Sequence, residues 1–191
     1  MRKIFLMALL PILVLIGTSS GNMVEAQNSS VSIGTGTSQQ YTLPFNNFYK
    51  NSFSQMTYCK SEIGQSGYIG ALVYQNSSTG STTFSELTIW LAHTPDSVVT
   101  STTSWIPQDS LRQVFHATNY TIPSGTGDLI IPLDSMFWYD GTHHLAVVVS
   151  HRATDYSSAV QFKYTPTSHN SCLGNQRELD GYREEIAASQ R

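Results

Sequence analysis

The side chains of this sequence best suited to contact a ligand are large aromatics, namely Trp90, Trp105, Trp138 and Tyr139. Trp90 alternates with Leu87, Ile89 and Leu91. If that apolar trio faces the core of a strand, the indole faces solvent, where it can stack on a sugar ring or another flat apolar surface. The other three aromatics fall in segments expected to connect strands, where binding residues are common. The alternative is that all of them only pack.

Cys59 and Cys172 are the only cysteines of the chain. In an oxidising compartment such a pair commonly forms a disulfide. A bridge over so long a loop would remove about 4 to 5 kcal/mol of chain entropy from the unfolded state. Two unpaired thiols, one of them buried as a small hydrophobic side chain, are the alternative.

The six histidines do not follow a metal-binding pattern. His143 and His144 are adjacent, so on a strand they would point to opposite faces, and no H-x-H or H-E-x-x-H spacing occurs. Asp140, Gly141 and Thr142 could offer oxygens to a structural calcium, but no D-x-D-x-D-G loop is present. The sequence therefore predicts turn histidines and no cofactor.

Enzyme motifs are weak in this chain. The sequence of residues 64–67, GQSG, lacks the final glycine and the strand-to-helix setting of a nucleophile elbow, and is better interpreted as a turn. A glycosidase needs two carboxylates about 5 to 9.5 Å apart, and the acidic residues here are scattered. We therefore expect no catalysis. The alternative is a glycan-active hydrolase whose carboxylates converge only in the fold.

Composition narrows the class of protein further. Hydrophobic residues make up 40% and charged residues 12% of 191 residues, with 10 Lys+Arg against 13 Asp+Glu. An ordinary soluble domain carries about 25% charged residues. So little charge disfavours a coiled coil or a nucleic-acid-binding surface, and the apolar content excludes a disordered chain. A β protein rich in serine and threonine fits this composition.

The elements that must position these side chains have a period of two. Apolar residues alternate with others over 69–73, 87–91, 129–133 and 160–164, while 145–149 (LAVVV) is apolar throughout, as in a central strand buried on both faces. Turn sequences rich in glycine and serine separate these segments. We expect an all-β fold, a single antiparallel β-sandwich domain of jelly-roll type over residues 27–176.

The two ends of the chain have different compositions. Arg2 and Lys3 precede an apolar run of residues 4–16, and small residues follow near Ala26. This pattern predicts a signal peptide over residues 1–26, because the run is shorter than the roughly 20 residues of a transmembrane helix; an uncleaved signal anchor is the alternative. After cleavage we expect no membrane span. Residues 177–191 are rich in charge and read as a solvated tail or a short helix.

Several short segments follow one another along the chain, among them IGTG at 33–36, PFN at 44–46, LTIWL at 87–91, FWYDGT at 137–142 and FKY at 162–164. In this order they resemble a β-sandwich module of secreted and cell-surface proteins of the Bacteroidetes, which often neighbours fibronectin-like, adhesin and protease domains. The resemblance covers about residues 31–170. It implies an exported location, whether secreted, at the cell surface or periplasmic.

The resemblance also bears on modification and on the end of the domain. Three serines follow an aspartate and precede an apolar residue, as in the pattern used for protein O-glycosylation in that group: Ser97, Ser110 and Ser135. Members of the group usually close with a further strand after residues 168–173, and the charged tail does not resemble one.

Together these observations favour an exported, non-catalytic binding or adhesion module whose partner is a glycan or an extracellular protein. A structural component of the cell envelope, in which the aromatics merely pack, is the alternative from a different class. Exposure of Trp90 and Trp138 distinguishes the two.

Overall fold

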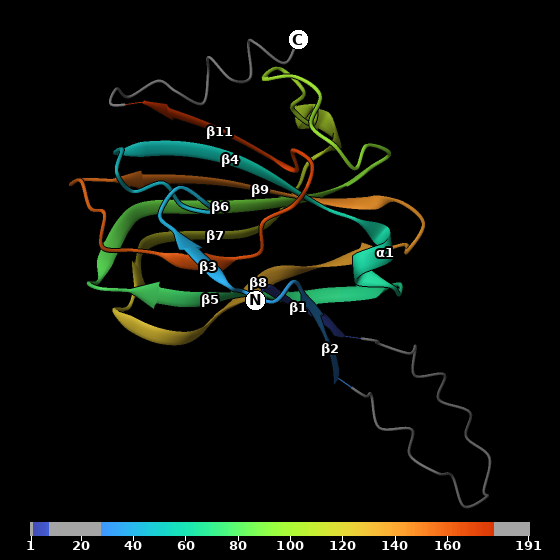
Figure 1. Ribbon diagram of the computed structural model, residues 1–191, viewed down its shortest axis with the longest axis horizontal. Helices are drawn as coiled ribbons and strands as arrows, with labels where there is room; N and C mark the ends of the chain where they lie inside the picture. Colours follow the sequence, from blue (N-terminus) through green and yellow to red (C-terminus); the bar gives the residue numbers. More distant parts are fainter. Residues whose placement is uncertain (1, 8–27, 178–191) are drawn as a thin grey trace, which may run out of the picture.

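The computed structural model describes residues 2–7 and 28–177 of the chain. They form a sandwich of two antiparallel sheets, which confirms the predicted all-β class. Figure 1 shows β11, β4, β9 and β6 lying above β5 and β1. The strands are β1 (Arg2–Met7), β2 (Asn28–Ile33), β3 (Ser38–Gln40), β4 (Asn51–Tyr58), β5 (Gly67–Ser78), β6 (Thr82–Thr94), β7 (Arg112–Ile122), β8 (Gly125–Tyr139), β9 (His144–Ala153), β10 (Phe162–Tyr164) and β11 (Cys172–Arg177).

The first sheet is organised around β5. Its strand β8 pairs along the whole of β5, while the opposite edge of β5 is shared. There β1 pairs with Tyr68–Tyr74 and β10 pairs at Asn76. The outer positions belong to β2, beside β1, and β3, beside β10. The long strand β5 thus pairs with both β1 and β10, so segments from the beginning and from the end of the described chain meet in this sheet.

The second sheet has the order β11-β4-β9-β6-β7. Its centre is β9, and Leu145–Val149 is at most 1% exposed, which confirms the prediction of a strand buried on both faces. At its edge β11 lies antiparallel to β4, with Cys172 opposite Met56. This strand begins before the charged tail, in a segment with little apolar pattern.

Residues from both sheets form one core. Fully buried aromatic and aliphatic side chains alternate along the facing strands, as the period of two requires, and include Phe84, Leu87, Ile89, Leu91, Ile131 and Leu145. His151 belongs to this core rather than to a turn, since it continues the inward stripe of β9 and stacks on Phe84 with ring centroids 4.3 Å apart. Burial lowers the pKa of His151 to about 4.

Helical structure is confined to short connections. The helix α1 (Lys60–Ile63) follows β4, and the 3-10 turn η1 (Gln108–Ser110) precedes β7. No helix in the described part of the chain is long and apolar enough to cross a membrane. Of the predicted leader, only residues 2–7 are described, as β1; residues 8–27 and the tail beyond residue 177 lie outside the described residues.

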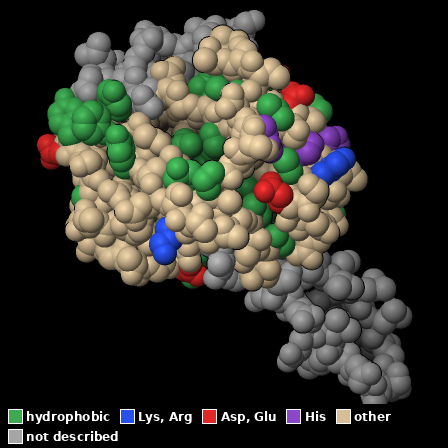
Figure 2. Space-filling view, in the orientation of Figure 1, with side chains coloured by type: hydrophobic (Ala, Val, Ile, Leu, Met, Phe, Trp, Pro, Cys, Tyr) green, Lys and Arg blue, Asp and Glu red, His purple; other side chains and the backbone are tan. Residues whose placement is uncertain are grey.

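The surface agrees with the composition. On the face seen in Figure 2, Lys, Arg, Asp and Glu side chains are few and scattered.

Candidate functional site

Trp138 lies on the outer face of the first sheet and is 49% exposed. Its neighbours on β8, Phe137 and Tyr139, point into the core at 6% and 0% exposure, so the alternation of the strand forces the indole outward. Directly opposite on β5 is Tyr68, whose ring meets the indole edge-on at 5.0 Å and 62°. The two rings form an aromatic pair with an open face.

Tyr139 is not available to a ligand, which makes its prediction as a binding residue wrong. It is fully buried, and its hydroxyl donates a hydrogen bond of 2.5 Å to the carbonyl oxygen of His143. Burial, with the nearby Asp140 carboxylate, raises the pKa of Tyr139 to about 12. Its neighbour in sequence, Trp138, faces the opposite way because adjacent strand residues alternate.

Trp90 faces away from the core, as its alternation with Leu87, Ile89 and Leu91 predicts. It is nevertheless only half-exposed, because it packs with Trp105 around the buried ring of Phe53. The centroid of Phe53 lies 6.2 Å from that of Trp90 and 5.1 Å from that of Trp105. These rings form a small second core on the outside of the second sheet.

The connection between β6 and β7 covers this second core. Gln55, on β4, holds it at two points: its side-chain nitrogen donates to the carbonyl oxygen of Ser104 at 3.2 Å, and its side-chain oxygen accepts from the N–H of Ile106 at 2.8 Å. Trp105 lies between these two residues. The two tryptophans therefore serve packing, and of the predicted aromatics Trp138 keeps an open surface.

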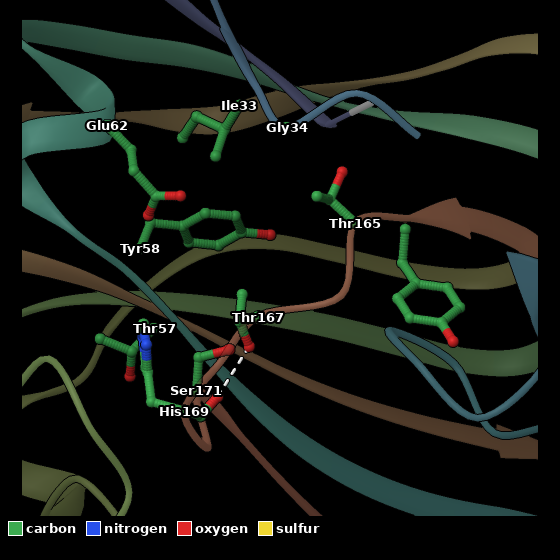
Figure 3. A pocket seen from close by; sticks show the side chains of 10 residues that line it. Ile33, Gly34, Thr57, Tyr58, Glu62, Thr165, Thr167, His169 and Ser171 are labelled. Carbon is green, nitrogen blue, oxygen red and sulfur yellow. Dashed lines mark hydrogen bonds between the residues drawn. The ribbon is translucent and has the colours of Figure 1, made fainter. Parts of the chain in front are cut away.

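A small polar pocket of about 60 Å³ opens at the end of the sandwich near α1. Figure 3 shows Tyr58 and Glu62 on one side of it and Thr165 and Thr167 on the other. A neighbouring hollow of about 340 Å³ continues along the segment 164–172. The lining residues come from β2, β4, α1 and the connection from β10 to β11, so their spacing in the sequence gave no signal of a shared site.

The side chains that line this pocket are mostly hydroxyls, with one carboxylate, that of Glu62, and one imidazole, that of His169. That carboxylate already accepts the backbone N–H of Cys59 at 3.0 Å. Thr165 is also engaged, since its hydroxyl oxygen accepts the N–H groups of Thr35 and Gly36 at 2.7 and 3.0 Å. Such a lining suits hydrogen bonding to a neutral polar molecule, and it lacks the carboxylate pair of a glycosidase.

Asp140 organises the turn between β8 and β9 instead of offering its oxygens to calcium. One carboxylate oxygen accepts the N–H groups of Thr142 and His143 at 2.8 and 3.0 Å, and the other lies 2.6 Å from the ring nitrogen Nδ1 of His143. Although burial opposes ionisation, these hydrogen bonds hold the pKa of Asp140 well below its usual range. Within residues 2–7 and 28–177, no three His, Cys, Asp or Glu side chains are placed to hold a metal ion.

The histidines around this turn also have structural partners. His144 accepts the backbone N–H of Lys60 at 3.2 Å, and His93 accepts that of Asp140 at the same distance. Burial lowers the pKa of His93, against the opposing effect of the Asp140 carboxylate. These contacts fix the turn beside Trp138.

Cys59 and Cys172 are free thiols in the structure, contrary to the expected disulfide. Cys172 pairs with Met56 across β11 and β4 and packs against the main core. Cys59 lies three residues beyond Met56, about 10 Å further along the strand direction, whereas a disulfide needs Cα atoms about 6 Å apart. The register of β11 therefore separates the two thiols.

The three serines expected from the resemblance to carry sugars differ in exposure. Ser110 and Ser135 are exposed, while Ser97 is half-buried. An exposed hydroxyl is the minimum that a modifying enzyme needs, so the first two are the better acceptors.

Comparison of the chain with models of protein families, with curated proteins and with solved structures finds no match. Evidence for function must therefore come from the geometry of the residues themselves.

Proposed function

We propose that the protein is an exported, non-catalytic binding module that presents Trp138 and Tyr68 to a glycan. The observation that carries this proposal is the half-exposed indole on the outer face of the first sheet, with a second ring beside it. The apolar face of a sugar ring stacks on such a surface, and the contact needs no charge. The sparse charge of the surface agrees with a neutral ligand.

The rigidity of the surroundings supports the same proposal. Trp138 is flanked by buried residues on β8, and the following turn is closed by the hydrogen bonds of Asp140. An aromatic side chain held on a rigid strand loses little conformational entropy on binding. The predicted leader and the resemblance to exported Bacteroidetes modules support a place outside the cytoplasm, where Ser110 and Ser135 could carry O-linked sugars.

A glycan-array screen of the exported protein tests the proposal, followed by titration of the best oligosaccharide with tryptophan fluorescence as the readout. Trp138→Ala is expected to abolish or strongly weaken binding. Ile130→Ala is the matched control, because Ile130 is an equally exposed apolar residue of β8, at 52% exposure. An array on which no glycan binds, or equal affinity in wild type and Trp138→Ala, would overturn the proposal.

Intact mass of the exported protein tests the modification separately. Added hexose masses that disappear in the double variant Ser110→Ala, Ser135→Ala would establish these acceptor serines. An unmodified mass contradicts them and leaves the glycan-binding proposal untouched.

A further inference from the structure

The strand β1 fills a position inside the first sheet, between β2 and β5. Its residues Arg2–Met7 pair antiparallel with Ile33–Asn28 of β2 on one side and with Tyr74–Tyr68 of β5 on the other. Among the strands that the structure describes, β1 is the pairing partner of β2. One short strand therefore satisfies two edges of backbone hydrogen-bonding groups.

This strand belongs to the segment that the sequence identifies as a signal peptide. Cleavage near Ala26 removes residues 2–7 and leaves two edges open at once. The edge of β5 over Tyr68–Tyr74 loses its neighbour, and the residues of β2 become the N-terminal arm of the exported chain. Open strand edges are strong sites for pairing with another chain.

The arm is anchored at its C-terminal end. Ile33 is 8% exposed in the main core, and the N–H groups of Thr35 and Gly36 donate to the hydroxyl oxygen of Thr165. Upstream of this anchor, residues 28–32 (NSSVS) carry no charge, so an arm of this composition can enter a sheet.

The direction of β2 disfavours filling the open position from within the same chain. Since β2 and β5 are both antiparallel to β1, they run parallel to each other. To pair with β5, the arm would have to cross a strand spacing of about 4.8 Å while Ile33 stays anchored, and it would pair in the parallel sense. A copy related by a two-fold axis that is perpendicular to the strands presents the same arm in the opposite, antiparallel direction.

We propose that the exported protein is a dimer in which the N-terminal arm, residues 28–32, of each copy inserts antiparallel along Tyr68–Tyr74 of the other. One cleavage creates both the donor arm and the acceptor edge in every copy, so a single two-fold axis satisfies both edges. The inference depends on removal of the leader and is independent of glycan binding by Trp138.

The experiment uses protein exported with its own leader and purified from outside the cytoplasm. N-terminal sequencing identifies the cleavage site, light scattering measures the mass in solution, and hydrogen exchange follows the backbone amides of Tyr68–Tyr74. Because β8 already pairs with one edge of β5, the proposal expects a mass of two chains and protection of those amides of Tyr68–Tyr74 that face the edge left by β1.

Val31→Pro and Val31→Thr form a matched pair of variants. Proline in the arm removes an N–H donor and disfavours insertion into a sheet, whereas threonine keeps strand propensity. Val31→Pro is expected to be monomeric, with the amides of Tyr68–Tyr74 that face away from β8 exchanging at least about tenfold faster, and Val31→Thr to remain dimeric. Thermal unfolding shows whether each variant is folded.

Four results would overturn the proposal: retention of residues 2–7 in the exported protein, a monomer in the wild type, a dimer that persists in Val31→Pro, or a different polypeptide bound along Tyr68–Tyr74. A folded monomer with the segment protected would mean that the chain closes its own sheet. Each of these results leaves the test of glycan binding unaffected, because that test uses Trp138.

Discussion

Trp138 and Trp90 occupy comparable positions on opposite faces of the sandwich. Each alternates with buried residues on its strand, and each therefore points away from the main core. Trp138 is 49% exposed beside Tyr68, whereas Trp90 packs with Phe53 and Trp105 under the connection from β6 to β7. The difference lies in what covers each face.

The comparison shows that the period of a strand determines only which face of its own sheet a side chain occupies. Whether that face meets solvent depends on the path of a connection elsewhere in the chain. For Trp90 this path is fixed by Gln55, because its two hydrogen bonds to Ser104 and Ile106 hold the connection between β6 and β7 against the sheet. Four experiments test whether one face binds, as proposed, while the other packs.

Acid is expected to have the largest effect, and it acts on the core between the two faces. The pKa of His151 is 6.5 in the unfolded chain and about 4 in the folded protein. The unfolded state therefore binds more protons between these two pH values. Stability is therefore highest above pH 6.5 and falls by about 3 kcal/mol as the pH drops to 4. Urea unfolding at pH 7, 5.5 and 4 measures this loss.

His151→Phe is the control for this pH dependence, since it keeps a ring beside Phe84 and removes the titration. Most of the slope between pH 6.5 and 4 should disappear, and a smaller part should remain because the pKa of His93 is also lowered. The pKa of Asp140 is also lowered in the folded protein, so protonation of Asp140 causes a further loss of stability at a lower pH. An unchanged slope in His151→Phe would refute the assignment.

Trp90→Ala is expected to reduce the free energy of unfolding by about 3 kcal/mol, because the substitution leaves a cavity beside Phe53. Glycan affinity should not change, since the site lies on the other face. Chemical denaturation and fluorescence titration measure the two quantities. A stable variant that fails to bind glycan would reverse the roles that we assign to the two faces.

Trp138→Ala should show the opposite pattern. Loss of the exposed indole is expected to weaken glycan binding by roughly 30-fold, or about 2 kcal/mol. Stability should change by no more than about 0.5 kcal/mol, as for most exposed positions. Calorimetry gives both values, and a large loss of stability without loss of affinity would make Trp138 a packing residue.

Tyr139→Phe is expected to have the smallest effect, a loss of about 1 kcal/mol in stability. The substitution removes the hydrogen bond to the carbonyl oxygen of His143 and leaves the buried ring in place. Glycan affinity should be retained. A selective loss of affinity in this variant would show that the turn between β8 and β9 positions Trp138.

Much of the second sheet was predictable because its apolar pattern is regular. The run 145–149 became the central strand β9, and residues 87–91 became the middle of β6. By contrast, β4 (NSFSQMTY) was missed, since it is buried despite being largely polar. Some of its polar side chains are satisfied by residues outside the strand, as when the hydroxyl of Ser54 donates to the carbonyl oxygen of Pro44 at 2.7 Å.

Local alternation of apolar residues is enough to predict the all-β class and the side of its strand on which Trp90 lies. The exposure of Trp138, the burial of Tyr139 and the separation of Cys59 from Cys172 follow instead from how the strands and connections pack. The tertiary structure also brought the residues of the polar pocket together from four separate segments. Which surfaces are covered, which residues pair across strands and which segments meet at a pocket all depend on contacts between residues distant in sequence. Local spacing of residue types does not reveal these contacts.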